Sequence, residues 1–364
     1  MNSRPPNKNS EIRSTIDAIQ SWLLGPEVQF AEGPHRGGVA GWFDEGGAPV
    51  FLYPEIAGYY LSWLAYFASI SGEVEQAARR AELTLSWIDR LLSDGTGLQT
   101  RIYLRGVPPD DWRNCGAFLF DLAMLARGVA QVWNLADGNR RQRIHSCLTE
   151  QLLLFCRDSE SLQAFRPYPD APSPPPHWSC VEGPYQAKAA AAILSANEAA
   201  RMPSRLQEAA RSSYMKWREH PRSNSTEDLH PMYYHLEGLA IAWADGWDPE
   251  ALSLLENAAM GNLMTRTPET MTSGRSDVIA QALRIGSILW DRCNQCDPTS
   301  NPVHQLAYLL QQYLDGGGAI LFCRNPSLRH RNVWSSIFAH QALLYYEAAI
   351  AGLPLGDRQL QFLV

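Results

Sequence analysis

The stretch TEDLHPMYYHLEGLAIAW, residues 226–243, determines the fold that the sequence predicts. A polar segment leads into apolar residues at helical spacing, and Pro231 suits the first helical position, where its missing N–H costs nothing. His230, His235 and Glu237 then fall within the first two turns. Core helices do not usually begin with histidines and a carboxylate. The stretch therefore predicts a helix that starts at a functional site.

The same periodicity recurs along the chain and predicts about twelve helices and almost no strand. A short ribbon is expected within 97–105 and a short apolar strand at 319–323. The expected helices cover approximately 11–24, 54–71, 73–92, 115–132 behind an Asn114 cap, 140–156, 185–200, 204–219, 231–244, 249–265, 277–289, 302–314 and 333–351.

The joins between these helices alternate in length. Most of the joins after the second, fourth, sixth, eighth and tenth helices are only a few residues, whereas those that lead into the even helices are long. Six hairpins with short turns at one end and long loops at the other describe an all-α (α/α)6 toroid, with the even helices as the inner ring. We expect a disordered leader over residues 1–9 and a single toroid domain over residues 10–364.

Composition excludes several classes of partner. The chain is 45% hydrophobic and 19% charged, with a formal net charge of −7, so neither nucleic acid nor an anionic membrane surface is an expected partner. It contains no apolar run of about 18 residues that could span a bilayer. Seven cysteines scattered through predicted helices fit reduced thiols in the cytoplasm. The oligomeric state does not follow from the sequence.

In such a toroid, the inner-helix starts and the long loops share one face, and their polar residues form the candidate site. Aromatic faces suit the C–H surface of a sugar, and carboxylates suit its hydroxyls. The catalytic candidates are Glu237, His235, Asp110, Asp111, Glu55 and His330. The substrate-binding candidates are Tyr53, Trp42, Arg113, Trp178, Tyr185, His230, Arg275, Asp277 and Trp334.

Each candidate also has a structural interpretation. Asp277 is a helix cap or an ion-pair partner of Arg275, and Glu55 is a first-turn partner of the helix dipole. His235 is a hydrogen-bonded core histidine in the same view. Glu237 is harder to explain in this way, because a carboxylate on an apolar helix face needs a partner. We therefore assign the general acid to Glu237.

No metal or cofactor is expected. Cys293 and Cys296 have CxxC spacing, but no second ligand pair follows, so we expect free thiols rather than a zinc site. The glycine pairs at 37–38 and 46–47 lack the strand–loop–helix context of a nucleotide site.

Three segments carry a resemblance to known families: YPEIAGYY at 53–60, RSDVIAQALR at 275–284 and NVWSSIFAHQAL at 332–343. They resemble six-hairpin and (α/α)6 carbohydrate-active proteins of polysaccharide and secondary-metabolite pathways. The chain is also distantly similar to the N-acylglucosamine 2-epimerase family, which implies proton transfer by His235 and by His330 or His340. The His-x-x-Glu spacing of that family is replaced here by His235-Leu-Glu237, and the zinc signatures of lanthionine cyclases are missing.

The sequence thus predicts an enzyme that acts by general acid–base chemistry on a saccharide or another hydroxylated small molecule, as a hydrolase or lyase. In this interpretation two carboxylates flank the scissile bond. Three alternatives stay open: a sugar epimerase with two histidine bases, a toroid cyclase of natural-product biosynthesis, and a non-catalytic sugar-binding or scaffold subunit.

Overall fold

The computed structural model describes residues 8–94, 98–108, 111–157, 161–197, 199–219, 229–263, 274–290, 301–353, 355 and 360–364. Within these ranges the chain forms twelve α-helices, which confirms the predicted all-α class. They are α1 (Lys8–Leu23), α2 (Pro54–Ser71), α3 (Val74–Ser93), α4 (Leu119–Gln131), α5 (Gly138–Leu153), α6 (Gln186–Ala196), α7 (Ser204–Trp217), α8 (Leu229–Ala244), α9 (Ala251–Leu263), α11 (Ser276–Ile288), α13 (Pro302–Gln311) and α14 (Val333–Ile350).

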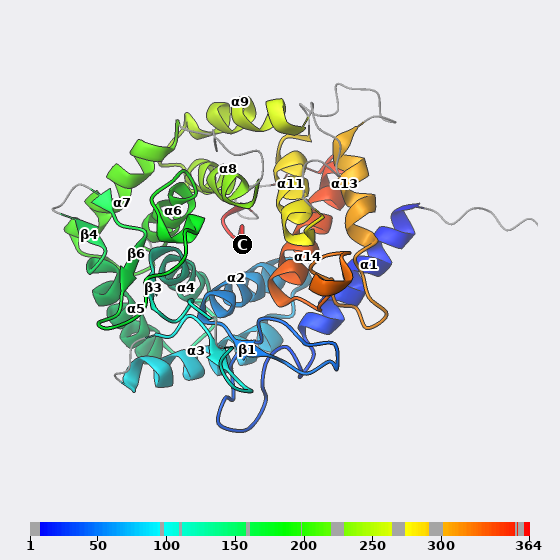
Figure 1. The fold of residues 1–364 in the computed structure, drawn as a ribbon. Coiled ribbons are helices and arrows are strands. Elements are labelled where there is room, and N and C mark those ends of the chain that lie inside the picture. The colour runs from blue at the N-terminus through cyan, green and yellow to red at the C-terminus, as the bar shows by residue number, and fades with distance from the viewer. Residues whose placement is uncertain are drawn as a thin grey trace, which may run out of the picture.

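The helices form two concentric rings. The inner ring runs α2, α4, α6, α8, α11 and α14, since each of these helices contacts the next and α14 contacts α2 again. The outer helices α3, α5, α7, α9, α13 and α1 each pack mainly on one inner helix, and α9 and α13 also contact the next one. Figure 1 looks along the axis and shows both rings. The predicted (α/α)6 toroid is confirmed.

Burial explains which helices lie inside. Every residue of α6 except Ser195 is buried, and α2 is buried continuously from Pro54 to Ala68. Helix α3, on the outside, buries one face only. Helices that are apolar on all sides must be covered on all sides, and the inner ring provides that cover.

Close approach of α2 and α4 depends on Gly58. A Cβ atom at Gly58 would lie 2.6 Å from the carbonyl oxygen of Met124 and 2.7 Å from Cα of Leu125. Both obstacles are backbone atoms, so the helices would have to move apart.

We expect Gly58→Ala to lower the free energy of unfolding by about 1–3 kcal/mol, because the added methyl overpacks the α2–α4 contact. Urea unfolding followed by circular dichroism measures this. Gly316→Ala is the matched control, since a Cβ there would meet nothing within 4 Å. Equal stability of the two variants would contradict the prediction.

Short two-stranded ladders tie down the long loops at one end of the ring. Strand β1 (Phe51–Leu52) pairs with β2 (Ile102–Tyr103), with Phe51 opposite Tyr103. Strand β3 (Gly116–Phe118) pairs with β6 (Phe165–Pro167), and β4 (Cys156–Arg157) pairs with β5 (Ser161–Leu162). The ribbon expected within 97–105 corresponds to β2. The strand expected at 319–323 is instead a set of isolated bridges, such as Leu321 with Arg331.

Three predicted helix starts need correction. Helix α1 begins at Lys8, inside the leader expected over residues 1–9, and residues 1–7 lie outside the described residues. Asn114 does not cap α4, which begins at Leu119; its side chain instead accepts from the backbone N–H of Arg101 (2.8 Å) and donates to the Arg101 carbonyl (2.7 Å). Helix α8 begins at Leu229, two residues before Pro231. Proline is still accommodated there, because the first turn leaves its N–H groups without intrahelical partners.

The centre of the ring is occupied by residues Leu360–Val364, near the C label in Figure 1. The Val364 carbonyl accepts from Lys188 Nζ (3.0 Å) and Arg284 Nη1 (2.7 Å), and Arg127 Nη2 donates to the Gln361 carbonyl at 2.6 Å. This segment fills the ring behind the site described next. No helix in the described ranges is long and apolar enough to cross a membrane.

Candidate active site

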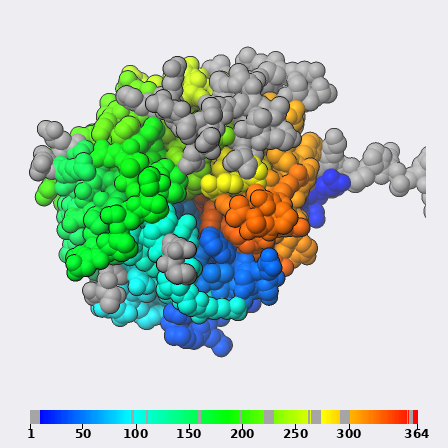
Figure 2. Space-filling model, viewed as in Figure 1, coloured from blue at the N-terminus to red at the C-terminus, as the bar shows by residue number. Residues whose placement is uncertain are grey.

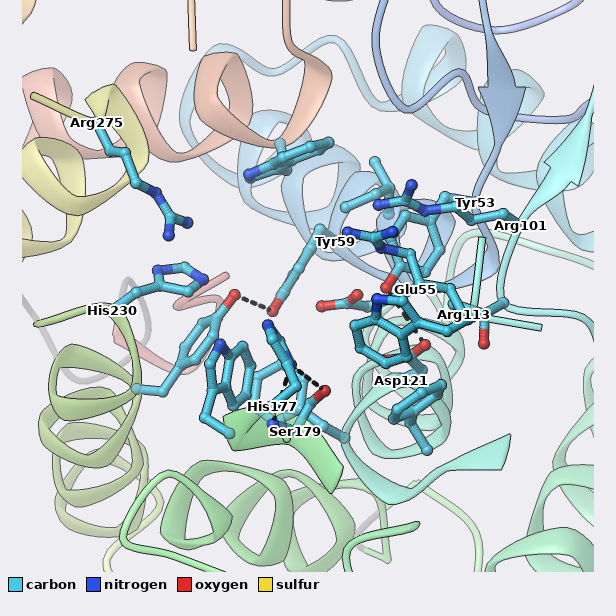
Figure 3. Close-up of a pocket in the computed structure, with 18 residues that line it drawn as sticks. Tyr53, Glu55, Tyr59, Arg101, Arg113, Asp121, His177, Ser179, His230 and Arg275 are labelled. Atoms are coloured by element: carbon cyan, nitrogen blue, oxygen red, sulfur yellow. Dashed lines mark hydrogen bonds between the residues drawn. The ribbon is translucent and has the colours of Figure 1, made fainter. Parts of the chain in front are cut away.

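One cavity of about 180 Å³ opens among the N-terminal ends of the inner helices. Figure 2 shows how closely the segments of this face approach one another at the centre of the ring, and Figure 3 shows the cavity itself. Each of the six inner helices, or the loop before it, contributes to the lining. The lining residues are Tyr53, Glu55, Ile56, Tyr59, Thr100, Arg101, Trp112, Arg113, Phe118, Phe120, Asp121, His177, Trp178, Ser179, His230, Tyr234, Arg275 and Trp334.

Two carboxyl groups meet at one wall, Glu55 in the first turn of α2 and Asp121 in the first turn of α4. A side-chain hydrogen bond joins them, and the Tyr53 hydroxyl donates to Asp121 Oδ2 at 3.4 Å. Burial and then the charge of Glu55 raise the pKa of Asp121 well above its usual range. Burial also raises the pKa of Glu55, against its side-chain contacts with Tyr53 and Tyr59. The pair therefore retains a proton where ordinary carboxyl groups have lost theirs.

Two tyrosines form the cavity floor. The Tyr59 hydroxyl donates to that of Tyr234 at 3.3 Å, and Tyr59 is also hydrogen-bonded to Glu55. Behind them, the fully buried Lys188 places Nζ 4.6 Å from the Tyr234 ring centroid and 5.2 Å from that of Tyr59. Burial lowers the pKa of Lys188 to about 8.

Three guanidinium groups surround the cavity. Arg101 is 8% exposed and its Cζ lies 4.3 Å from the Phe51 ring and 4.9 Å from the Trp42 ring. Within the described residues, its side chain has one long hydrogen bond, to the Tyr103 hydroxyl at 3.4 Å, and Nε has none. Arg113 and Arg275 are instead neutralised by nearby aspartates. Among these three, Arg101 is the guanidinium that forms no salt bridge with a carboxylate in the described residues, and most of its donors are unused.

His230 faces the carboxyl pair across the ring, from α8. Its Nδ1 lies 2.6 Å from Gln281 Oε1 and 3.9 Å from Asp277 Oδ2. Burial and the charge of Arg275 lower the pKa of His230 to about 4, so the imidazole is neutral at pH 7. A neutral imidazole has one nitrogen that can accept a proton.

Arg275 and Asp277 support this side of the cavity. Arg275 binds both oxygens of Asp277, at 3.1 and 2.7 Å, and Trp334 Nε1 donates to the same carboxylate at 3.2 Å. Burial raises the pKa of Asp277, but Arg275 and His230 outweigh it and hold the pKa at about 2. Asp277 is therefore a fixed anion that orients cavity residues.

Twelve of the residues predicted from the sequence fall into two groups. Seven line the cavity: Glu55, Tyr53, Arg113, Trp178, His230, Arg275 and Trp334. Another five lie just behind it. Asp277 supports Arg275, Asp111 binds Arg113 Nη1 at 3.2 Å, and the Tyr185 hydroxyl donates to the Val181 carbonyl at 2.9 Å. His330 and Trp42 stack on each other with ring centroids 4.6 Å apart.

The expectation that Glu237 and His235 face the cavity needs correction. Glu237 is fully buried in an ion cluster, where Lys188 Nζ lies 2.8 Å from Oε2 and Arg284 binds Oε1. His235 lies on another side of α8, and its Nε2 is 3.1 Å from the Arg218 carbonyl. His330 is likewise absent from the cavity lining, and burial lowers its pKa to about 4. Asp110 lies outside the described residues.

Sequence reasoning missed Asp121, Arg101, Tyr59, Tyr234 and His177. Asp121 could have been noticed, because it is an isolated carboxylate in the otherwise apolar start of α4. The tyrosines had no distinguishing signal among buried aromatic residues. Arg101 and His177 lie in loops, and their positions depend on ladders and turns that are not periodic in sequence.

Metal ligation has no support in the described ranges, where no three His, Cys, Asp or Glu side chains come together as a possible metal site. Cys293 and Cys296 lie outside the described residues. The described cysteines, Cys115, Cys147, Cys156, Cys180 and Cys323, form no disulfides with one another.

Comparisons with known proteins give the fold and leave the reaction open. No family model matches the chain, and no curated protein matches it. Among solved structures, it is similar to cellobiose 2-epimerase from Bacillus thermoamylovorans (TM-score 0.67, 8% identity, covering 93% of this chain and 99% of that one). It is also similar to a D-mannose isomerase (TM-score 0.64, 13% identity, 96% and 100%) and to unsaturated glucuronyl hydrolase from a Bacillus species (TM-score 0.60, 13% identity, 95% and 98%).

These similarities place the chain among proteins with the (α/α)6 toroid fold. The similar structures are those of hydrolases, epimerases and an isomerase that act on sugars, so the fold does not choose among these reactions. The choice depends on the residues in the cavity.

Proposed function

We propose that this protein is a carbohydrate-processing enzyme that cleaves a small, carboxylate-bearing saccharide by general acid–base catalysis. The observation that carries the proposal is the buried pair of carboxyl groups of Glu55 and Asp121, whose pKa values burial raises and which faces the neutral His230 across one cavity.

The carboxyl pair supplies the acid. Asp121 holds a proton because its burial and the neighbouring Glu55 disfavour a second negative charge. A carboxyl group in this state can protonate the oxygen that leaves as a glycosidic C–O bond breaks. The two groups are hydrogen-bonded to each other, whereas carboxylates that flank a glycosidic bond are separated by about 5 Å or more. The pair therefore acts as a single acid, in place of the two carboxylates that were expected to flank the scissile glycosidic bond.

His230 supplies the base. A water molecule that attacks the sugar carbon must lose a proton as the new C–O bond forms, and a neutral imidazole accepts it. Bond breaking and proton transfer then balance: the leaving oxygen gains the proton of the carboxyl pair, and His230 gains one from water.

The cavity favours hydrolysis over the alternatives. Epimerisation by two histidines needs a second free imidazole base, but His177 Nδ1 already accepts from the backbone N–H of Ser179 at 3.3 Å. Its other nitrogen consequently carries the hydrogen in the neutral ring and cannot accept. A cyclase would favour an apolar cavity, and this lining contains carboxyl, imidazole and guanidinium groups.

The substrate is small and anionic. A volume of about 180 Å³ is below the ~300–1,000 Å³ of typical ligand pockets, which fits a sugar ring better than a long chain. Trp112, Trp178 and Trp334 line the walls and offer faces for the sugar C–H surface. The unused donors of Arg101 match a carboxylate on that ring.

Substitution of Arg101 tests this assignment. We expect the wild-type protein to release reducing sugar from acidic disaccharides and to act poorly on neutral ones. Arg101→Met should raise KM for acidic substrates by about 10–100-fold with less change in kcat, because it removes charge-assisted hydrogen bonds to the substrate.

Arg105→Met is the matched control, since Arg105 lies in the same loop but is exposed and pairs with Asp44 at 2.8 Å. Thermal unfolding of each variant separates loss of folding from loss of binding. Equal turnover of acidic and neutral disaccharides by the wild-type protein would contradict the proposed substrate class. A scaffold or sugar-binding subunit would bind saccharides without turnover.

A further inference from the structure

A continuous chain of hydrogen bonds runs from the buried ion cluster to the cavity. Glu237 accepts from Lys188 Nζ at 2.8 Å, from Arg284, and from Gln281 Nε2 at 3.2 Å. The other end of the Gln281 amide, Oε1, lies 2.6 Å from His230 Nδ1. The side chains of Glu237, Gln281 and Arg284 are all fully buried, so water does not compete for these contacts.

The carboxylate determines which way the Gln281 amide points. A carboxylate held between two cations offers only acceptor oxygens, so it must be contacted by the amide NH₂ and not by the amide oxygen. The amide oxygen then faces His230 and offers no hydrogen. Nδ1 must therefore donate to it, which leaves the lone pair of the neutral ring on Nε2.

Other charged groups around His230 agree with this arrangement. Asp277 Oδ2 lies 3.9 Å from Nδ1, on the side where the hydrogen is placed. Arg275 holds Asp277 through two hydrogen bonds. No hydrogen bond in the described part of the chain involves His230 Nε2, and the residue lines the cavity. The accepting nitrogen is thus available to a ligand.

We infer that Gln281, oriented by Glu237, is a positioning residue that fixes His230 as the Nδ1–H tautomer with its Nε2 lone pair available to the substrate. This inference deepens the proposed function, on which its catalytic meaning rests. It also gives the ion cluster around Glu237 a role in the site, although none of its charged groups lines the cavity. Transfer of a proton to Nε2 creates an imidazolium whose Nδ1–H stays on the Gln281 oxygen.

Nitrogen NMR of histidine-labelled protein measures the tautomer directly. Two-bond correlations between ring nitrogens and ring protons distinguish the Nδ1–H and Nε2–H forms, and the His230 signals are assigned by their loss in His230→Gln. We expect the Nδ1–H form in the wild-type protein at pH 7. An Nε2–H form would overturn the inference, whether or not any saccharide is turned over.

A matched pair of variants isolates Gln281. Gln281→Met keeps the length of the side chain but removes the acceptor of Nδ1–H, and we expect the Nε2–H form to appear and kcat to fall by about 10–100-fold with little change in KM. Gln341→Met makes the same change at another buried amide, which accepts from Arg284 Nη1 at 3.0 Å and does not contact His230. It should leave the tautomer unchanged.

The two hypotheses fail in different ways. Absence of turnover with the expected tautomer would contradict the proposed function and leave the tautomer inference standing. An unchanged Nδ1–H form in a folded Gln281→Met would overturn the role of Gln281.

Discussion

Replacement of Asp121 by asparagine should lower kcat by about 10² or more while the protein stays folded. Asparagine keeps the shape and the hydrogen bond with Tyr53 but has no acidic proton to donate. Glu55→Gln should have a comparable effect, because the proton is shared in one hydrogen-bonded pair. The effects should not add in the double variant, since removal of either group already disables the unit.

Asp245→Asn provides the matched control for Asp121→Asn. Asp245 is also a carboxyl group whose pKa is raised by burial, against Arg127 and a hydrogen bond with Ser195. It follows the C-terminal end of α8 and is not part of the cavity lining. Its variant should keep wild-type kcat. Undiminished turnover in Asp121→Asn would remove the acid from the proposed mechanism.

The pH dependence of kcat provides an independent check on the pair. Activity needs the protonated acid, so kcat should fall as pH rises through the pKa of the pair. Burial and the charge of Glu55 place the pKa of Asp121 well above its usual range, so this descending limb should lie above the range of ordinary carboxyl groups. In Asp121→Asn the residual activity should lose this limb. If Asp121→Asn keeps a descending limb of kcat at the same pH, that limb belongs to a group other than the carboxyl pair.

The ring of helices could be predicted from sequence because its signals are local. Apolar spacing identified segments such as Pro54–Ser71, and alternating loop lengths identified hairpins. Helix boundaries were less certain where capping did not follow the usual side-chain rule. Phe118 stands at the N-cap of α4, where no side chain provides a cap hydrogen bond, while the expected cap Asn114 holds the Arg101 backbone.

The site could be located but its chemistry could not be assigned. The prediction that polar residues at inner-helix starts share a rim led to Glu55, His230 and Arg275, which do line one cavity. Position along and around α8 decided the failures. His235, five residues after His230, points about 140° away from it on an ideal helix, whereas Glu237, seven residues after His230, shares its face but lies about 10 Å deeper in the ring. Partners distant in sequence decided the rest: Glu237 meets Lys188 from α6 and Arg284 from α11, and no spacing rule predicts that contact.

The buried ion cluster leads to the largest expected loss of stability. Glu237→Gln should lower the free energy of unfolding by about 3–5 kcal/mol, because it leaves Lys188 and Arg284 buried without their counterion. The matched control is Glu347→Gln, which breaks a partly exposed pair with Arg13 (3.1 Å) and should cost about 1 kcal/mol or less. Urea unfolding of both variants measures the difference.

Because Lys188→Met removes one of the unpaired charges, adding it to Glu237→Gln should cost less than the sum of the two single losses. A stably folded Glu237→Gln with abolished turnover and an unchanged Nδ1–H tautomer of His230 would instead return the acid role to Glu237. The structure favours the first outcome, since a carboxylate held by two cations and a glutamine amide has no proton to give to a substrate in the cavity.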